Sequence, residues 1–215
     1  MDTPLTVPAM PSTPLAVRAV EYIRSCETAS VANHSIRSFL FAAMLAEHEG
    51  RRPAADFDPD LLFFACLLHD LGTSPLASGT QRFEVDGADM AAAFLADNGA
   101  DASSVDLVWD AIALHTSPGI AERRSVLAYL TRAGIGLDFG RSSEFITDDQ
   151  AQVIHARHPR LDMATALIDE IVRHAARGPV NAPRYTLAGE LVRERGQDGH
   201  PTSLERAAQA SRWGE

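Results

Sequence analysis

An apolar run that ends in a polar pair constrains the fold of this chain more than any other feature. Residues 61–68 read LLFFACLL, and His69 and Asp70 follow directly. The run is too short to span a bilayer and is typical of a helix in a protein core. A histidine and an aspartate that emerge from such a helix need a partner, because burying them without one costs several kcal/mol. A divalent metal ion would be such a partner, because imidazole and carboxylate groups bind these ions.

Helix signals place this polar pair near a helix end. Asp58 followed by Pro59 is typical of an N-cap and a first helical position, and Gly72 is a stop signal. We therefore expect a helix over residues 59–71. Neighbouring side chains on a helix point about 100° apart, so two adjacent residues share one ion only where local geometry brings them together, typically near a helix end.

The remainder of the chain is also patterned for helices, and no segment alternates apolar and polar residues strongly enough to predict a strand. Asn33 and Asp86 are interpreted as N-caps, and glycines follow several of the expected helices. Further helices are expected over residues 14–25, 33–49, 86–98, 104–115, 125–138 and 162–176, with another that begins at Thr147. The sequence therefore predicts an all-α fold.

Length and composition indicate a single globular domain. At 215 residues, with 46% hydrophobic and 22% charged side chains, the chain can bury a sizeable core. We expect an irregular N-terminal arm over residues 1–13, a domain over residues 14–195 and a peripheral tail over residues 196–215. The helices over residues 162–195 are the candidate interface of a homo-oligomer, which the sequence neither requires nor excludes.

Charge and cysteine content narrow the choice of partners and compartment. The net charge of −10 argues against non-specific binding to nucleic acid or to an anionic membrane. Cys26 and Cys66 are the two cysteines, and they favour free thiols in a reducing cytoplasm over a disulfide framework. No segment reaches transmembrane length, and the first residues lack the basic and apolar regions of a signal peptide. We therefore expect a cytoplasmic protein.

Four side chains form a candidate metal-binding set: His34, His69, Asp70 and Asp138. Each lies near the start or the end of an expected helix. Converging helix ends are one way in which a helical bundle builds a metal site. A lone histidine on an apolar face is more often a satisfied core residue than a ligand, so the case depends on the set taken together.

The residues around this set resemble the HD-domain superfamily of metal-dependent hydrolases, in which a histidine, a His-Asp pair and a distant aspartate follow in this order. Four stretches look like its cyanamide-hydratase-like branch: NHSIR at 33–37, HDLGT at 69–73, RFEVDGA at 82–88 and HT at 115–116. The resemblance covers roughly residues 15–185. It implies an HD-domain helical bundle whose metal site, formed by the four candidate ligands, lies at converging helix ends.

The resemblance also bears on the number of metal ions. HD proteins with two metals usually supply two further histidines between the His-Asp pair and the last aspartate, but this chain has only His115 there. His155 and His158 follow only after Asp138. The count favours one divalent metal, with Zn²⁺ expected first and Fe, Mn or Ni as alternatives, and it disfavours a di-iron oxygenase. His115 would then face the substrate or support a ligand.

The branch implies a reaction on a small molecule. A metal-bound hydroxide would add to a nitrile-type substrate such as cyanamide and give urea. One alternative is an HD-type phosphohydrolase that acts on a nucleotide or another phosphate ester. This chain contains no lysine, so Arg37 and Arg82 would have to grip the phosphate, as arginine forks can. A second alternative is a metal-binding module without turnover, which the intact ligand set disfavours.

One stretch departs from the branch. After the Phe-Glu element the chain continues Val85-Asp86-Gly87, where cyanamide hydratases carry an aromatic residue and glycines. This difference changes the wall of the pocket or the cap of a helix. The substrate could therefore be a relative of cyanamide or a different compound.

Other polar residues near the motifs are candidates for catalysis and substrate binding. Glu84 is the candidate for moving a proton or orienting water, and a capping role is an equal alternative. Arg37 could orient a ligand carboxylate or form a structural salt bridge. Thr73 and Thr116, together with His115, could bind a small polar substrate, although each hydroxyl could equally satisfy a helix end.

Overall fold

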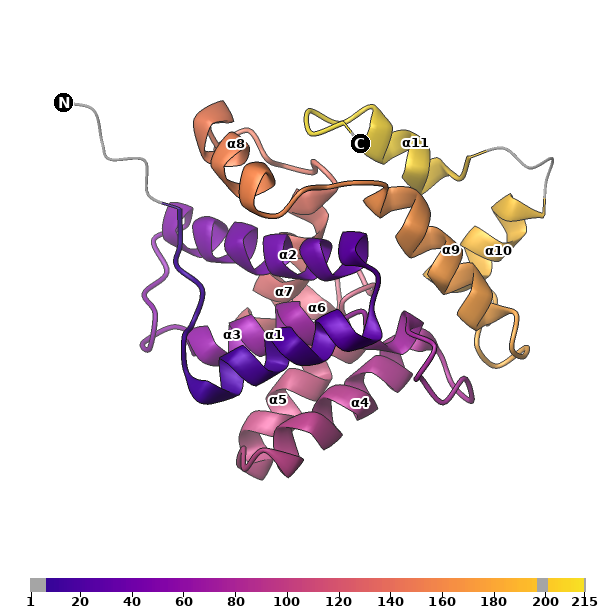
Figure 1. Cartoon of the computed structure of the whole chain (residues 1–215), viewed down its shortest axis with the longest axis horizontal. Helices are drawn as coiled ribbons and strands as arrows, with labels where there is room; N and C mark the ends of the chain where they lie inside the picture. Colours follow the sequence, from indigo (N-terminus) through magenta and orange to yellow (C-terminus); the bar gives the residue numbers. More distant parts are fainter. Residues whose placement is uncertain (1–6, 197–200, 215) are drawn as a thin grey trace.

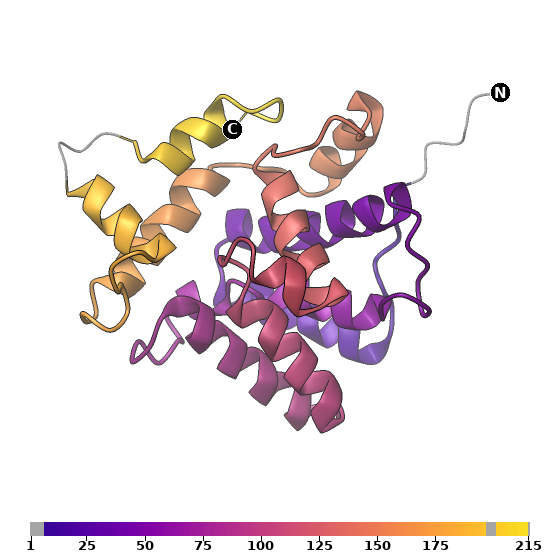
Figure 2. The same cartoon turned by 180° about the vertical axis from the view of Figure 1, so that it is seen from behind.

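The chain folds into packed helices, as a computed structural model of residues 7–196 and 201–214 shows (Figure 1, Figure 2). No strand occurs in this described part, so the predicted all-α fold is confirmed. Residues 1–6, 197–200 and 215, which fall in the predicted arm and tail, lie outside the described residues. Among the described helices, none is long and apolar enough to cross a lipid bilayer.

The helical elements follow one another through short connections. In chain order they are α1 (Pro14–Cys26), α2 (Ala29–His48), α3 (Pro59–Leu68), η1 (Leu71–Thr73), α4 (Phe83–Asp97), α5 (Ala102–Ala113), α6 (Ala121–Arg124), α7 (Val126–Asp138), α8 (Asp148–Arg157), α9 (Met163–Ala175), α10 (Leu187–Arg195) and α11 (Ser203–Gln209). Several begin with a polar cap whose side chain accepts a backbone N–H of the first turn, as Thr13, Asp58, Asp101 and Ser125 do.

The core is built around α2, most of whose side chains are buried and which packs against α3, α7 and α9. Helix α7 approaches α2 closely because Gly134 has no side chain. A Cβ atom at this position would lie 2.3 Å from the carbonyl oxygen of Ser38 and 2.6 Å from the Cβ atom of Ala42. This approach brings Asp138, at the end of α7, beside His34 of α2.

A second close approach lies directly after the His-Asp pair. Helix α3 ends at Leu68, earlier than the predicted span of residues 59–71, and the 3-10 turn η1 follows. Gly72 of this turn lies against the start of α4, where a Cβ atom would be 1.8 Å from the carbonyl oxygen of Phe83. Only glycine fits such a contact. Gly72 therefore allows helix packing instead of acting only as a stop signal.

The N-cap predicted at Asn33 is wrong. Helix α2 begins at Ala29, so Asn33 lies inside the helix. The side-chain amide of Asn33 donates a hydrogen bond to the carbonyl oxygen of Pro159 at 2.9 Å. A local pattern does not reveal a partner so far along the chain, and the same residue type suits both roles.

The N-cap predicted at Asp86 is also wrong. Helix α4 begins at Phe83, and Asp86 lies in its first turn. The Asp86 carboxylate accepts hydrogen bonds from the hydroxyl of Ser78 and the backbone N–H of Gly79, and it lies 2.9 Å from Nε2 of His174 in α9. Asp86 therefore fastens the loop before α4 to α9.

The C-terminal helices α9, α10 and α11 group at one side of the molecule (Figure 1). The described part of the predicted tail contacts the helices before it. The ring of Trp213 stacks on that of Phe41 with 5.7 Å between centroids, and its indole N–H donates to the carbonyl oxygen of Leu137 at 2.6 Å. The division of the chain at residues 13 and 195 stays a prediction.

Candidate metal centre

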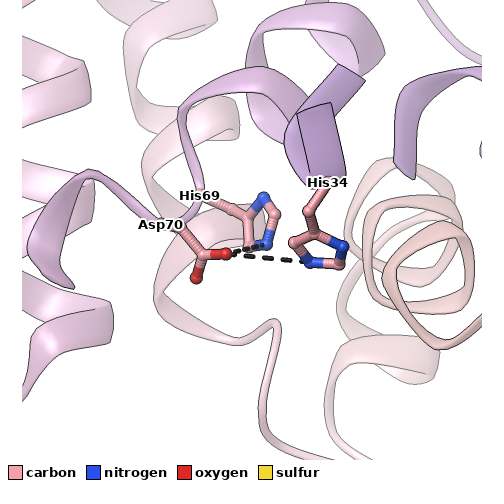
Figure 3. A group of neighbouring side chains, drawn as sticks. All are labelled: His34, His69 and Asp70. Atoms are coloured by element: carbon pink, nitrogen blue, oxygen red, sulfur yellow. Dashed lines mark ion pairs between the residues drawn. The ribbon is translucent and has the colours of Figure 1, made fainter. Parts of the chain in front are cut away.

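Three side chains meet just beyond the end of α3 (Figure 3). His34 comes from α2, and His69 and Asp70 follow α3 directly. Nε2 of His69 lies 3.0 Å from Oδ2 of Asp70, and Nε2 of His34 lies 3.7 Å from the same oxygen. One ligand atom from each residue lies within 4.8 Å of the other two, and all three residues are buried. This group could hold a metal ion.

The end of α3 allows two adjacent residues to face one point. His69 is the C-cap of the helix and keeps helical dihedrals, with φ −66° and ψ −29°. Asp70 has φ −97° and ψ 3° and has left the helix. The wide angle between neighbouring helical side chains therefore does not separate this pair. The helix-end position expected from the sequence is the feature that makes a shared ion possible here.

Hydrogen bonding fixes which nitrogen of His34 is free. Nδ1 of His34 lies 2.6 Å from Oδ2 of Asp138. Burial alone would raise the pKa of Asp138, but Arg37 and His34 hold it well below its usual range, so this carboxylate is ionised and only accepts hydrogen bonds. Nδ1 must therefore donate, which leaves a lone pair on Nε2. That Nε2 atom is buried and has no hydrogen-bond partner.

His69 is held in the same manner. Its Nδ1 lies 2.7 Å from the carbonyl oxygen of Cys66, which can only accept, so Nδ1 donates and the lone pair of Nε2 faces Asp70. Burial raises the pKa of Asp70, but His69, His34 and His115 together outweigh burial and lower it to about 2. Burial lowers the pKa of His69, but Asp70, the carbonyl group of Cys66 and Asp138 together outweigh burial and raise it. In the absence of a metal ion, a proton on Nε2 of His69 can therefore balance the negative charge of the Asp70 carboxylate.

Three lone-pair atoms aimed at one point suit a divalent cation. Two imidazole nitrogens and a carboxylate oxygen are an established ligand set for zinc and related ions. The other ring nitrogen of each histidine donates to a carboxylate or to a backbone carbonyl, which is how metal-binding histidines are usually held. An ion at this point would also satisfy Nε2 of His34 and Oδ2 of Asp70, which are buried without hydrogen-bond partners.

Among the described residues, the structure does not bring the predicted ligand Asp138 into this group. Nε and Nη2 of Arg37 donate to the two carboxylate oxygens of Asp138, each at 2.7 Å. Nη1 of Arg160 donates to Oδ1 at 3.2 Å and to the backbone carbonyl oxygen of Asp138 at 2.8 Å. Asp138 therefore holds His34 through Nδ1, the ring nitrogen that does not face Asp70.

Arg37 and Arg160 support this anchor from different parts of the chain. Arg37, a predicted catalytic candidate, is fully buried, and its Nη1 also donates to the carbonyl oxygens of His158 and Pro159 at 3.0 and 3.1 Å. It therefore binds the carboxylate of Asp138. Sequence reasoning missed Arg160, because no local pattern marks an arginine in an irregular connection.

Glu84 lies beside the site without reaching the cavity. Its Oε1 accepts hydrogen bonds from Nη2 of Arg82 at 2.7 Å and from the hydroxyl of Thr116 at 2.6 Å, and its Oε2 accepts from Nε of Arg82 at 3.3 Å. Burial raises the pKa of Glu84, but Arg82, His115 and Thr116 together lower it, so the side chain is ionised. The Thr116 hydroxyl donates its one proton to Glu84, so its oxygen can only accept a hydrogen bond from a second partner.

His115 lies next to the candidate ligands. Its ring centroid is 5.0 Å from that of His69, and its Nδ1 lies 2.6 Å from the carbonyl oxygen of Ile112. Burial first, and then His69, lower the pKa of His115 to about 4, so the ring is neutral near pH 7. Nδ1 therefore carries the proton, and Nε2 is left with a lone pair.

Thr73, a predicted substrate-binding residue, does not line the cavity. Its hydroxyl lies 2.8 Å from the carbonyl oxygen of Asp70 and 3.2 Å from Oε2 of Glu170 in α9. Thr73 thus closes the turn after Asp70 and ties it to α9. Sequence reasoning missed Glu170, a buried carboxyl group on α9 whose pKa is raised by burial.

A cavity of about 1080 Å³ opens above the three candidate ligands. His115 and Thr116 line it, as do the three ligands themselves. Neither Glu84 nor Arg37 is part of its wall. Of the predicted site residues, some line the cavity. Others, namely Arg37, Thr73, Glu84 and Asp138, lie outside its wall.

The model of the HD domain family matches residues 31–176, a span that contains all of these ligands. The chain belongs to the HD domain family. It is also similar to two proteins of Saccharomyces cerevisiae, cyanamide hydratase DDI2 and cyanamide hydratase DDI3, at 26% identity over 180 residues. Each match covers 82% of this chain and 79% of the yeast protein. The family predicted from the sequence is confirmed, and it supports a metal-dependent hydrolase or hydratase that acts on a small molecule.

Proposed function

We propose that this HD-domain protein is a metal-dependent hydratase that adds water to a nitrile-type carbon, with cyanamide as its simplest substrate. The reaction would be H₂N–C≡N + H₂O → H₂N–CO–NH₂. The convergence of His34 Nε2, His69 Nε2 and Asp70 Oδ2 below the cavity is the observation on which the proposal depends. The similarity to two cyanamide hydratases supports the choice of substrate class.

The three ligands would leave further coordination positions of the ion open to the cavity. A divalent ion held there would supply an activated water, because it lowers the pKa of bound water from about 16 towards 7. Zn²⁺ is the ion we expect first, since two histidines and one carboxylate with open positions are a known catalytic zinc arrangement. Fe, Mn and Ni remain alternatives that the same ligands would accept.

His115 is placed to handle the protons of the reaction. Its Nδ1 proton is held by the carbonyl oxygen of Ile112, so Nε2 is free to accept a proton from water and to return one to nitrogen. The low pKa of about 4 keeps this nitrogen unprotonated near neutral pH. We therefore assign proton transfer to His115 rather than to Glu84.

Thr116 would orient the substrate. Its hydroxyl donates to Glu84, so the oxygen that lines the cavity is left as an acceptor for the N–H groups of cyanamide. In this assignment Glu84 is a positioning residue, because both of its oxygens are occupied by Arg82 and Thr116.

The phosphohydrolase alternative meets an obstacle in the structure. Arg37 is buried against Asp138, and Arg82 is paired with Glu84, so neither of the arginines nearest the motifs is free to grip a phosphate. The cavity wall contains Arg132 and Arg141 instead, on the side of α7. A phosphohydrolase would have to use these two residues.

The proposal is tested by measuring urea release from cyanamide with metal-replete protein, alongside a panel of nucleotides and phosphate esters. We expect turnover of cyanamide in the wild type and none in His69→Ala, which should also lose its metal. Phosphate release without urea would replace the hydratase by the phosphohydrolase. Metal binding without any turnover would favour the non-catalytic module.

A further inference from the structure

We propose that the preferred substrate is a nitrile with a large, neutral, apolar substituent, which occupies the outer part of the cavity between α7, α9 and α10. This inference rests on the proposed function, because it names the substrate class of the same site. Cyanamide has only three non-hydrogen atoms. A cavity of about 1080 Å³ is slightly larger than the cavities that hold drug-sized ligands, roughly 300–1,000 Å³.

The apolar wall begins directly beside the candidate ligands. The ring of Phe139 lies 5.5 Å from that of His34, and the ring of Phe83 lies 5.6 Å from that of His115. Both phenylalanines line the cavity. A hydrogen atom or a small amino group on the nitrile carbon would be too small to contact these rings, whereas a hydrocarbon substituent would contact them.

Farther from the ligands, the wall is formed by side chains of the C-terminal helices. Leu167 and Ile171 of α9 are buried at 4% and 2% exposure, and Leu187 of α10 and Leu204 of α11 are partly buried. These four aliphatic groups face one cavity from three helices. They provide the kind of surface that binds an apolar group by removing it from water.

Several charged groups of the wall are paired within the protein, whereas Arg141 and Glu144 of the wall are exposed to solvent. Arg132 pairs with Glu122 at 2.8 Å, and Glu49 pairs with Arg51 at 2.7 Å. Nε of Arg132 is buried without an acceptor, which leaves one donor for a neutral acceptor atom on the substituent. Beside Phe139, Leu167 and Ile171, a charged substituent would leave water without a charged partner from these side chains. The substituent is therefore neutral.

Phenylacetonitrile is a suitable probe, since its hydration, C₆H₅CH₂–C≡N + H₂O → C₆H₅CH₂–CO–NH₂, is the proposed reaction with an apolar group attached. We expect its kcat/KM to exceed that of cyanamide by at least about tenfold, because binding energy of the remote group can lower the barrier at the reacting carbon. An equal or lower kcat/KM for phenylacetonitrile would overturn the inference.

Variants of the wall give a second test. Leu187→Trp and Leu204→Trp, on two different helices, should each lower the ratio of kcat/KM for phenylacetonitrile to that for cyanamide by about tenfold or more. Val192→Trp is the matched control, because Val192 lies on α10 as well but is 39% exposed and outside the cavity wall. A ratio that stays at the wild-type value in both leucine variants would contradict the proposed location of the substituent.

Binding of the product separates this inference from the proposed function. Calorimetric titration with phenylacetamide needs no turnover, so it reports on the apolar outer part of the cavity even if no nitrile is hydrated. We expect saturable binding to the wild type and to Val192→Trp, with affinity reduced at least about tenfold in Leu187→Trp. Absence of turnover of both cyanamide and phenylacetonitrile would reject the hydratase alone, whereas absence of phenylacetamide binding would reject the apolar part of the cavity.

Discussion

Asp138 holds His34 through the ring nitrogen that faces away from the metal-binding group. The distance from Oδ2 of Asp138 to Nδ1 of His34 is 2.6 Å, and Arg37 and Arg160 keep the carboxylate ionised and in place. The contact sets both the tautomer and the orientation of His34, so that Nε2 is presented to Asp70. The geometry of the site thus depends on a residue that does not belong to the three-ligand group.

Replacing Asp138 tests this relationship. We expect Asp138→Asn to weaken metal binding by about 10–100-fold, the usual effect of removing a group that orients a metal-binding histidine. Competition with a chromophoric chelator would measure the affinity. Asp148→Asn is the control, since the Asp148 side chain is 94% exposed. Unchanged affinity in Asp138→Asn would contradict the anchoring role, and complete loss of metal would make Asp138 a ligand after all.

Glu84 and Thr116 should act as one unit. We expect Glu84→Leu and Thr116→Val each to lower kcat/KM while metal content stays at the wild-type level. The double variant should be scarcely worse than the more damaging single one, because both changes break the same hydrogen bond. Steady-state kinetics and metal analysis of the three variants would check this. Multiplicative effects would show instead that Glu84 acts on its own, as the sequence-based interpretation had it.

Two glycines of α7 allow a matched test of the packing that carries Asp138. Gly134→Ala would place a Cβ atom 2.3 Å from the carbonyl oxygen of Ser38, so we expect unfolding free energy to fall by at least about 1–3 kcal/mol. Gly136→Ala meets no atom closer than 3.7 Å and should stabilise the helix, by up to about 1 kcal/mol. Urea denaturation would measure both. Equal changes in unfolding free energy for the two variants would mean that α2 and α7 do not pack as closely at Gly134 as the structure shows.

His155 should make the fold sensitive to acid. Burial lowers its pKa to about 4, whereas a histidine in the unfolded chain titrates near about 6.5. Between these values the unfolded state binds more protons than the folded state, so stability falls as the pH decreases. We expect His155→Phe to show a smaller loss of Tm between about pH 6.5 and 4 than the wild type. The same slope in both proteins would place the acid-sensitive group elsewhere.

The sequence predicts best where local chemistry decides the structure. Thr147 begins α8 with a capping box that Gln150 completes, and Asp58 caps α3 as its pattern indicates. The stop signal after α3 also places His69 and Asp70 where a shared ion is possible. These features depend on neighbours within a few positions along the chain, which a pattern can show.

Prediction fails where a polar side chain is claimed by a partner far along the chain. Asn33 bonds to Pro159, and Asp86 bonds to His174. Each of these side chains could also serve as a cap or a ligand, so its residue type alone does not choose between the roles. Tertiary packing decides which role each side chain takes, and a single sequence does not show how the helices pack.

The position of the bound ion is the most direct test of the proposed site. Anomalous diffraction from crystals grown with Zn²⁺ should show one peak, bonded to Nε2 of His34, Nε2 of His69 and a carboxylate oxygen of Asp70. Nδ1 of His34 should still lie within hydrogen-bond distance of Asp138. A peak bonded to other residues, or no peak at all under saturating metal, would contradict the site.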